Sequence, residues 1–117
     1  MDNHREHLRA PLRLQLNYRD ATGGNFLFEY SKNISRGGIF IETHHPLPKG
    51  SKIVVRFQPP GNESELEVEG EVVWVNPFVE GGENPNPGMG IQFMNMDEET
   101  RGVIASIVKA IAILPEG

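Results

Sequence analysis

The chain has 117 residues, which is enough for one domain with a single modest core. It contains no cysteine, and this excludes disulfides, thiolate metal sites and thiol nucleophiles. The net charge of −5 argues against a nucleic-acid binder, no apolar run is long enough to cross a bilayer, and the first residues lack the apolar segment of a secretory signal. We therefore expect a cytoplasmic protein that does not insert into membranes.

Residues 1–10 are polar and carry no apolar period, so we expect a mobile N-terminal arm followed by one domain over residues 11–117. Residues 1–36 hold six of the eleven basic side chains and four of the sixteen acidic ones, a local net charge of +2 in an otherwise acidic chain. Arg5 and Arg9 are four residues apart, so they share one side of either a helix or an extended segment. Their two guanidinium groups can therefore converge on one anionic target.

Six segments have the composition and alternation of β-strands. They cover residues 12–19, 26–34, 38–43, 51–58, 66–75 and 89–94. The alternation predicts an inward row of Leu12, Leu14, Leu16, Tyr18, Ile53, Val55, Phe57, Leu66, Val68, Val72 and Trp74. We expect most of the strand aromatics to lie in the core: Phe26, Phe28, Phe57, Trp74 and Phe93.

One helix follows the last strand. Asn95 or Asp97 can cap its N-terminus, and Pro115 ends it. Its apolar face consists of Val103, Ile104, Ile107, Val108 and Ile111. Residues 76–88, rich in proline, glycine and asparagine, form the longest loop. The pattern predicts an all-β fold with one helix: a small six-stranded antiparallel β-barrel closed by a C-terminal amphipathic α-helix.

Catalytic motifs are absent from the sequence. It has no Gly-x-Ser-x-Gly elbow, no Gly-x-x-x-x-Gly-Lys-Ser/Thr loop and no His-Glu-x-x-His. Three acids alternate at Glu67, Glu69 and Glu71, which is typical of a solvated sheet face. We therefore expect no enzymatic activity, no catalytic residue, no metal site and no cofactor.

Residues 33–38, Asn-Ile-Ser-Arg-Gly-Gly, form a polar corner between two predicted strands. Because residues two apart face the same side of a strand, Asn33 and Ser35 can present an amide and a hydroxyl to one target. Gly37 and Gly38 are expected to supply positive φ and close access to the backbone, with Arg36 beside them. An ordinary hairpin turn has the same composition, and this segment alone favours that interpretation.

Arg5-x-x-x-Arg9 followed, after 23 intervening residues, by Asn33-x-Ser35-x-x-Gly38 resembles the two-part signature of PilZ domains, bacterial receptors for cyclic di-GMP. The resemblance covers essentially the whole chain, because six strands and a closing helix match the PilZ barrel. The segment from Gly88 to Phe93 is also similar to that of short stand-alone PilZ proteins.

This resemblance implies specific roles for five residues. Arg5 and Arg9 would grip phosphates and stack on or hydrogen-bond the guanines of cyclic di-GMP. Asn33 and Ser35 would contact a guanine and its neighbouring phosphate, with Gly38 shaping the surface beneath. The expected secondary contacts are His4, Arg36 and Gly37, where His4 stands at a position that is arginine in many members.

The resemblance further implies a receptor or adaptor, monomeric or dimeric, that orders its arm on binding cyclic di-GMP and signals to a downstream protein. Two alternatives stay open. One is a PilZ-like interaction module that binds no nucleotide. The other is an oligonucleotide-binding barrel, which usually exposes interleaved aromatic and basic residues on a sheet face. The expected burial of the aromatics and the negative net charge argue against that class, so no nucleic-acid partner is expected.

Overall fold

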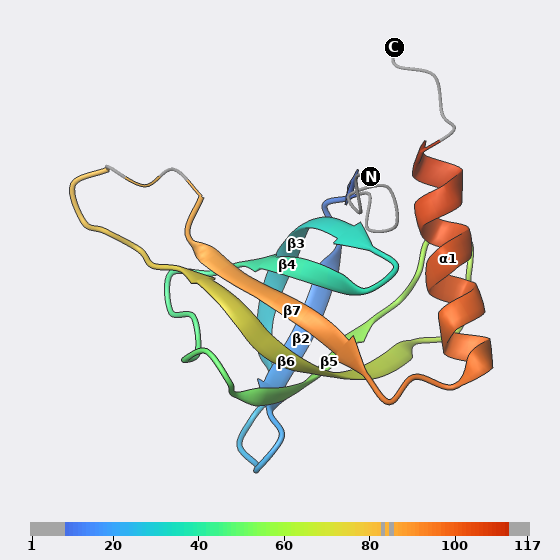
Figure 1. Ribbon diagram of the computed structural model, residues 1–117, viewed down its shortest axis with the longest axis horizontal. Coiled ribbons are helices and arrows are strands. Elements are labelled where there is room, and N and C mark those ends of the chain that lie inside the picture. Colours follow the sequence, from blue (N-terminus) through green and yellow to red (C-terminus); the bar gives the residue numbers. More distant parts are fainter. Residues whose placement is uncertain (1–8, 83, 85, 113–117) are drawn as a thin grey trace, which may run out of the picture.

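The computed structural model describes residues 9–82, 84 and 86–112, and these form a β-barrel with one helix (Figure 1). The strands are β1 (Ala10–Pro11), β2 (Gln15–Asp20), β3 (Leu27–Ser35), β4 (Gly38–Glu42), β5 (Lys52–Phe57), β6 (Leu66–Asn76) and β7 (Gly88–Met94). The helix α1 spans Glu98–Ala112. No helix in this part of the chain is long and apolar enough to span a membrane.

The sheet closes on itself. Its strands follow the order β3-β2-β5-β6-β7-β4, and a β3–β4 pairing completes the ring of six antiparallel strands. The short β1 is an additional strand that pairs with the end of β3, where Ala10 faces Ile34 and Pro11 faces Asn33. The predicted barrel is therefore confirmed, and β1 is an element that the sequence pattern did not separate from β2.

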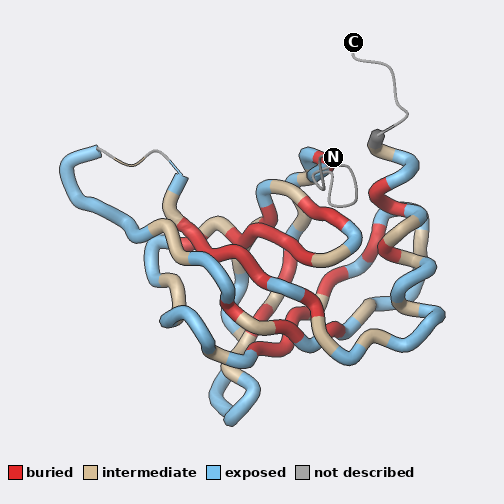
Figure 2. Tube along the Cα trace, viewed as in Figure 1, coloured by how far each residue is buried: buried red, intermediate tan, exposed pale blue. Residues whose placement is uncertain are grey.

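The core fills the barrel and continues under α1 (Figure 2). Inward positions of the strands alternate with outward ones as expected, and Leu16, Ile53 and Phe57 are buried. Ile104 and Ile107 of α1 belong to the same core, and the helix contacts β1 and β3. The helix therefore packs on the barrel through its apolar face, as its periodicity predicts.

The N-terminus of α1 is capped by Asp97. The backbone N–H of Thr100 donates to Asp97 Oδ1 at 2.8 Å, and hydrogen bonds from Thr100 lower the pKa of this carboxyl below its usual value. Asn95, the other candidate cap, instead adopts a φ of 57° in the turn before the helix. Asp97 is therefore the N-cap of the helix, which begins at Glu98.

A buried serine on β3 binds the backbone of residues 12–14, which connect β1 to β2. The Ser31 hydroxyl donates to the carbonyl of Leu12 and accepts the backbone N–H of Leu14 at 3.0 Å, and Ser31 is completely buried. The β3–β4 register shifts just after this residue, between Ser31 and Asn33. The hydroxyl therefore satisfies backbone groups that the strand ladder leaves free.

Removing this hydroxyl should destabilise the barrel. Ser31→Ala leaves the Leu14 N–H without its partner, and we expect a loss of about 1–3 kcal/mol of unfolding free energy. Urea unfolding measures the loss, with Ser106→Ala at an exposed position of α1 as the control. Equal midpoints for the two variants would show that the bridge contributes nothing.

The expected burial of the aromatics is wrong for two of them. Phe57 and Phe93 are buried, but Phe28 is 56% exposed and Trp74 is 55% exposed. Leu16 pairs with Glu29 and faces inward, so strand alternation turns the neighbouring Phe28 outward. The β6–β7 register shifts between Val72 and Trp74, and this irregularity carries the tryptophan to the outer face.

Candidate functional site

The polar corner forms where β1 meets the hairpin of β3 and β4. An Nη1–H of Arg9 donates to Asn33 Oδ1 at 2.9 Å, and the Arg9 side chain is exposed. Because a guanidinium group only donates, this contact fixes the amide oxygen of Asn33 toward Arg9 and leaves its NH₂ group for another partner. Two residues that are 24 positions apart in the chain therefore present hydrogen-bond donors side by side.

Ser35 and Gly38 hold the turn of this hairpin. Ser35 is 2% exposed, and its hydroxyl accepts the N–H of Gly37 at 3.3 Å and donates to the carbonyl of Gly38 at 3.4 Å. Arg36 is exposed at the tip of the turn. In this structure the Ser35 hydroxyl is therefore occupied by the backbone of its own turn.

The expected positive φ is wrong for both Gly37 and Gly38. Close packing explains instead why residue 38 is a glycine. A Cβ at this position would overlap the carbonyl oxygen of Ile91 on the neighbouring strand β7. Gly38 is buried. Its absence of a side chain brings β4 and β7 together.

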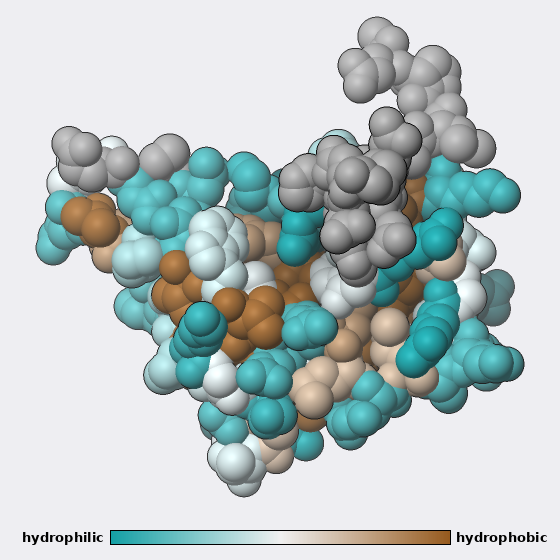
Figure 3. Space-filling view, viewed as in Figure 1, coloured by the Kyte–Doolittle hydropathy of each residue, from teal (hydrophilic) through white to brown (hydrophobic). Residues whose placement is uncertain are grey.

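One cross-strand row leads from the corner to the exposed tryptophan. Asn33 on β3 pairs with Phe40 on β4, Phe40 pairs with Gly90 on β7, and Gly90 pairs with Trp74 on β6. Gly90 has no side chain, so the Phe40 and Trp74 rings meet above it with centroids 5.4 Å apart. This face of the barrel carries apolar surface around β6 and β7 (Figure 3). Trp74 therefore adds an exposed aromatic surface to the face on which Asn33 lies.

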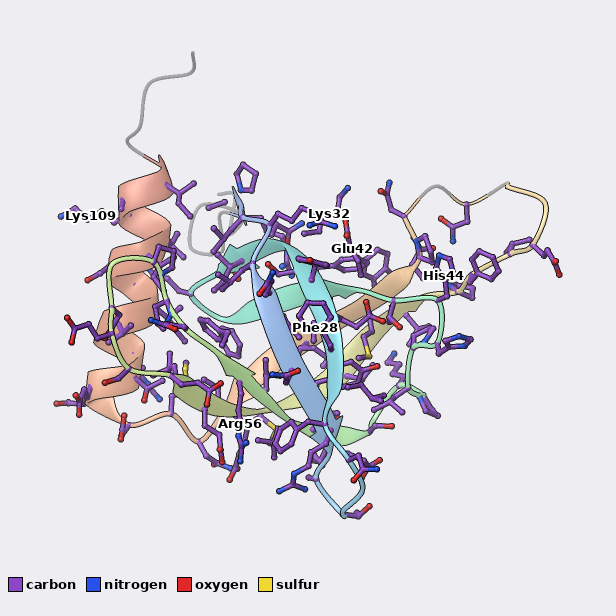
Figure 4. All side chains as sticks on the ribbon, turned by 180° about the vertical axis from the view of Figure 1, so that it is seen from behind. Phe28, Lys32, Glu42, His44, Arg56 and Lys109 are labelled. Carbon is purple, nitrogen blue, oxygen red and sulfur yellow. The ribbon has the colours of Figure 1, made fainter. Side chains whose placement is uncertain are left out.

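A cavity of about 470 Å³ lies at the other end of the β3–β4 pair, away from the corner. It is lined by Arg13, Glu29, Tyr30, Glu42, Thr43, His44, His45, Asn86 and Pro87. The Arg13 guanidinium lies 3.7 Å from the centroid of the Tyr30 ring, and Tyr30 pairs with Glu42 across the strands. Figure 4 shows Lys32, Glu42 and His44 following one another along this edge of the barrel. The sequence did not single out this cavity, because its walls come from four separate segments.

Arginines and aromatic rings also alternate over β2, β3 and β5. Arg19 and Arg56 lie over the half-buried Phe26 ring, 5.2 and 4.0 Å from its centroid, and the exposed Phe28 contacts Tyr30 edge-on. Arg56 Nε also donates to Glu67 at 2.9 Å. This arrangement weakens the argument from aromatic burial against an oligonucleotide-binding barrel, while the charge argument remains.

Two residues of the expected site, His4 and Arg5, lie outside the described residues. Within the described part of the chain, no three histidine, aspartate or glutamate side chains are placed to hold a metal ion. His44 instead stacks on Phe78 with ring centroids 4.1 Å apart.

Comparison with known proteins identifies the family. The family model of the PilZ domain matches residues 3–110, which is nearly the whole chain. The chain belongs to the PilZ domain family. No match was found among curated proteins. The Arg9–Asn33 hydrogen bond joins the two segments whose motifs resemble the PilZ signature.

Solved structures share this PilZ fold. The PilZ domain with c-di-GMP of YcgR from Escherichia coli superposes with a TM-score of 0.69 at 16% identity, covering 94% of this chain and 92% of that one. The PilZ domain of CeSA from a cellulose-synthesizing bacterium gives 0.65 at 14% identity, with 89% and 97% covered. The Bacillus subtilis inhibitor of motility MotI/DgrA gives 0.73 at 17% identity, covering 94% of this chain and 51% of that one. At these identities the likeness is one of fold.

Proposed function

We propose that this PilZ domain binds cyclic di-GMP on the outer face of its barrel, at the corner formed by β1, β3 and β4. The observation that carries the proposal is the Arg9–Asn33 contact, which brings the two halves of the PilZ signature together. The likeness to the PilZ domain of YcgR, which is described with c-di-GMP, supports the same ligand.

Each group of the corner has a use toward this ligand. Arg9 keeps N–H donors beyond the one given to Asn33, and these suit phosphate oxygens. The NH₂ group of Asn33 makes no hydrogen bond within the described part of the chain, and it can donate to a base acceptor. Trp74 offers a face for base stacking, which typically contributes about 1–3 kcal/mol per base. Ser35 and Gly38 would act chiefly by holding the turn that positions Asn33 and Arg36.

The protein would act as a cytoplasmic receptor or adaptor without enzymatic activity. Ligand binding would change the arm, and a downstream protein would recognise the changed surface. A second candidate function is an interaction module that binds no nucleotide. It is favoured by the exposed Phe28, which contacts the Tyr30 ring on which Arg13 lies. Interfaces between proteins are enriched in such aromatic and arginine side chains.

A fluorescence titration separates these two functions. Trp74 is the only tryptophan in the chain, so its emission reports on this face of the barrel alone. We expect a saturable change with cyclic di-GMP at micromolar concentrations and none with GTP or single-stranded RNA. Binding to none of the three would favour the interaction module.

We further expect the arm to become ordered on binding. The expectation rests on the low apolar content of the predicted arm, residues 1–10, and ordering costs roughly 1–2 kcal/mol per fixed backbone residue. Hydrogen exchange should therefore be fast across residues 4–8 in the free protein and slower with cyclic di-GMP. Slow exchange without ligand, unchanged when it is added, would rule out the arm as the switch while leaving binding itself intact.

A further inference from the structure

The cavity borders the same outer face of β3 and β4 as the corner. We call this part of the face, from the Asn33–Phe40 pair to the Tyr30–Glu42 pair, the strip. Asn33 pairs with Phe40, and Tyr30 pairs with Glu42. Phe40 and Glu42 are two residues apart on β4, so they share a face at a separation of about 6.8 Å. A ligand that extends along the strip by one further base would reach the cavity.

Basic side chains lie at both ends of the strip and beside its middle. Arg9 lies at the corner, and Arg13, four residues later, lies at the cavity. Between them Lys32 is exposed on β3, with its Nζ donating to Asn86 Oδ1 at 2.9 Å. Asn86 also lines the cavity, so this contact joins Lys32 to the cavity wall. The phosphates of a ligand that lies along the strip could therefore form charge-assisted hydrogen bonds with these side chains.

The walls of the cavity match the edges of a guanine base. The half-buried Glu42 carboxylate accepts hydrogen bonds, and guanine offers N1–H and N2–H as adjacent donors. Arg13 is held in place by the Tyr30 ring, and its guanidinium suits the O6 and N7 acceptors of guanine. Adenine lacks both the paired donors and the O6 acceptor. The cavity volume of about 470 Å³ falls within the range of small-molecule sites.

We infer that this cavity receives the second guanine of the cyclic di-GMP molecule whose first guanine lies at Asn33. The inference rests on the proposed function and extends it, because it makes Glu42 and Arg13 residues that determine base specificity. Lys32 then lies beneath the linking phosphates.

Calorimetric titration with cyclic di-GMP and cyclic di-AMP tests the inference. Glu42→Gln should weaken cyclic di-GMP binding about tenfold, the discrimination typical of a bidentate base contact, and should reduce the preference over cyclic di-AMP. Arg13→Ala should weaken cyclic di-GMP binding comparably. Glu65→Gln, which removes one negative charge from an exposed loop, is the matched control and should leave both affinities unchanged.

The outcomes separate the two proposals. If the wild-type protein binds no cyclic di-GMP, the proposed function and this inference both fail. If it binds but Glu42→Gln behaves like Glu65→Gln, the cavity is not a guanine subsite and the proposed function stands. An equal gain in affinity for both ligands in Glu42→Gln would mean that the carboxylate only repels phosphate, which also overturns the inference.

Discussion

Replacing Arg9 with alanine should weaken cyclic di-GMP binding by roughly ten- to a hundredfold. Hydrogen bonds to charged groups contribute about 1.5–3 kcal/mol, and 1.4 kcal/mol corresponds to a factor of ten in affinity. The substitution also frees the Asn33 amide to rotate, because Arg9 fixes its orientation in this structure. Thermal unfolding should change little, since the Arg9 side chain is exposed. Calorimetry and a melting curve on the same sample measure both effects.

Arg101→Ala provides the matched control for Arg9→Ala. Arg101 is exposed on α1, so this variant loses the same charge away from the corner. It should retain the wild-type affinity at moderate salt, where distant exposed charges are screened. Equal affinities of the Arg9 and Arg101 variants would place the site elsewhere, and an unfolded Arg9→Ala protein would make Arg9 structural.

Substitution of Gly38 should act on stability before it acts on binding. Gly38→Ala places a Cβ against the Ile91 carbonyl oxygen, so β4 must move away from β7. Such overpacking typically costs about 1–3 kcal/mol of unfolding free energy. Urea unfolding measures the loss, and binding is measured at a temperature where the variant is folded.

The control for Gly38→Ala has the opposite expected sign. Gly102 lies in α1 with open space around the position of a Cβ, so Gly102→Ala should stabilise the helix by about 0.5–1 kcal/mol. If Gly38→Ala keeps full stability yet loses binding, the residue serves ligand approach directly and the packing explanation is wrong.

The barrel was predictable because alternation is a local signal. Leu16, Ile53 and Phe57 face the core as their spacing indicates, and the helix packs through Ile104 and Ile107. The outward position of Trp74 was not predictable, because a register shift in β6 depends on pairing with a strand far along the chain. The same alternation, with the facing strand known, would have placed Phe28 outside.

The sequence paired two of the candidate residues correctly in space, but it did not give the conformation of the others. The motif spacing indicates that Arg9 and Asn33 belong together, and they are in contact. Ser35 is a buried side chain that holds the turn, which sequence cannot distinguish from one that faces a ligand. The cavity beside Glu42 was missed because its walls come from segments that only the closed barrel brings together.

Backbone amide NMR during titration with cyclic di-GMP tests the central claim most directly, because it reports binding and location together. We predict saturable shifts concentrated at residues 33–38, at Phe40 and at the Trp74 indole, with little change over β5 and the exposed face of α1. The Arg9→Ala protein should require a much higher ligand concentration for the same shifts. An absence of saturable shifts, or shifts confined to the β2–β5 face around Phe28, would contradict the proposed site and its ligand.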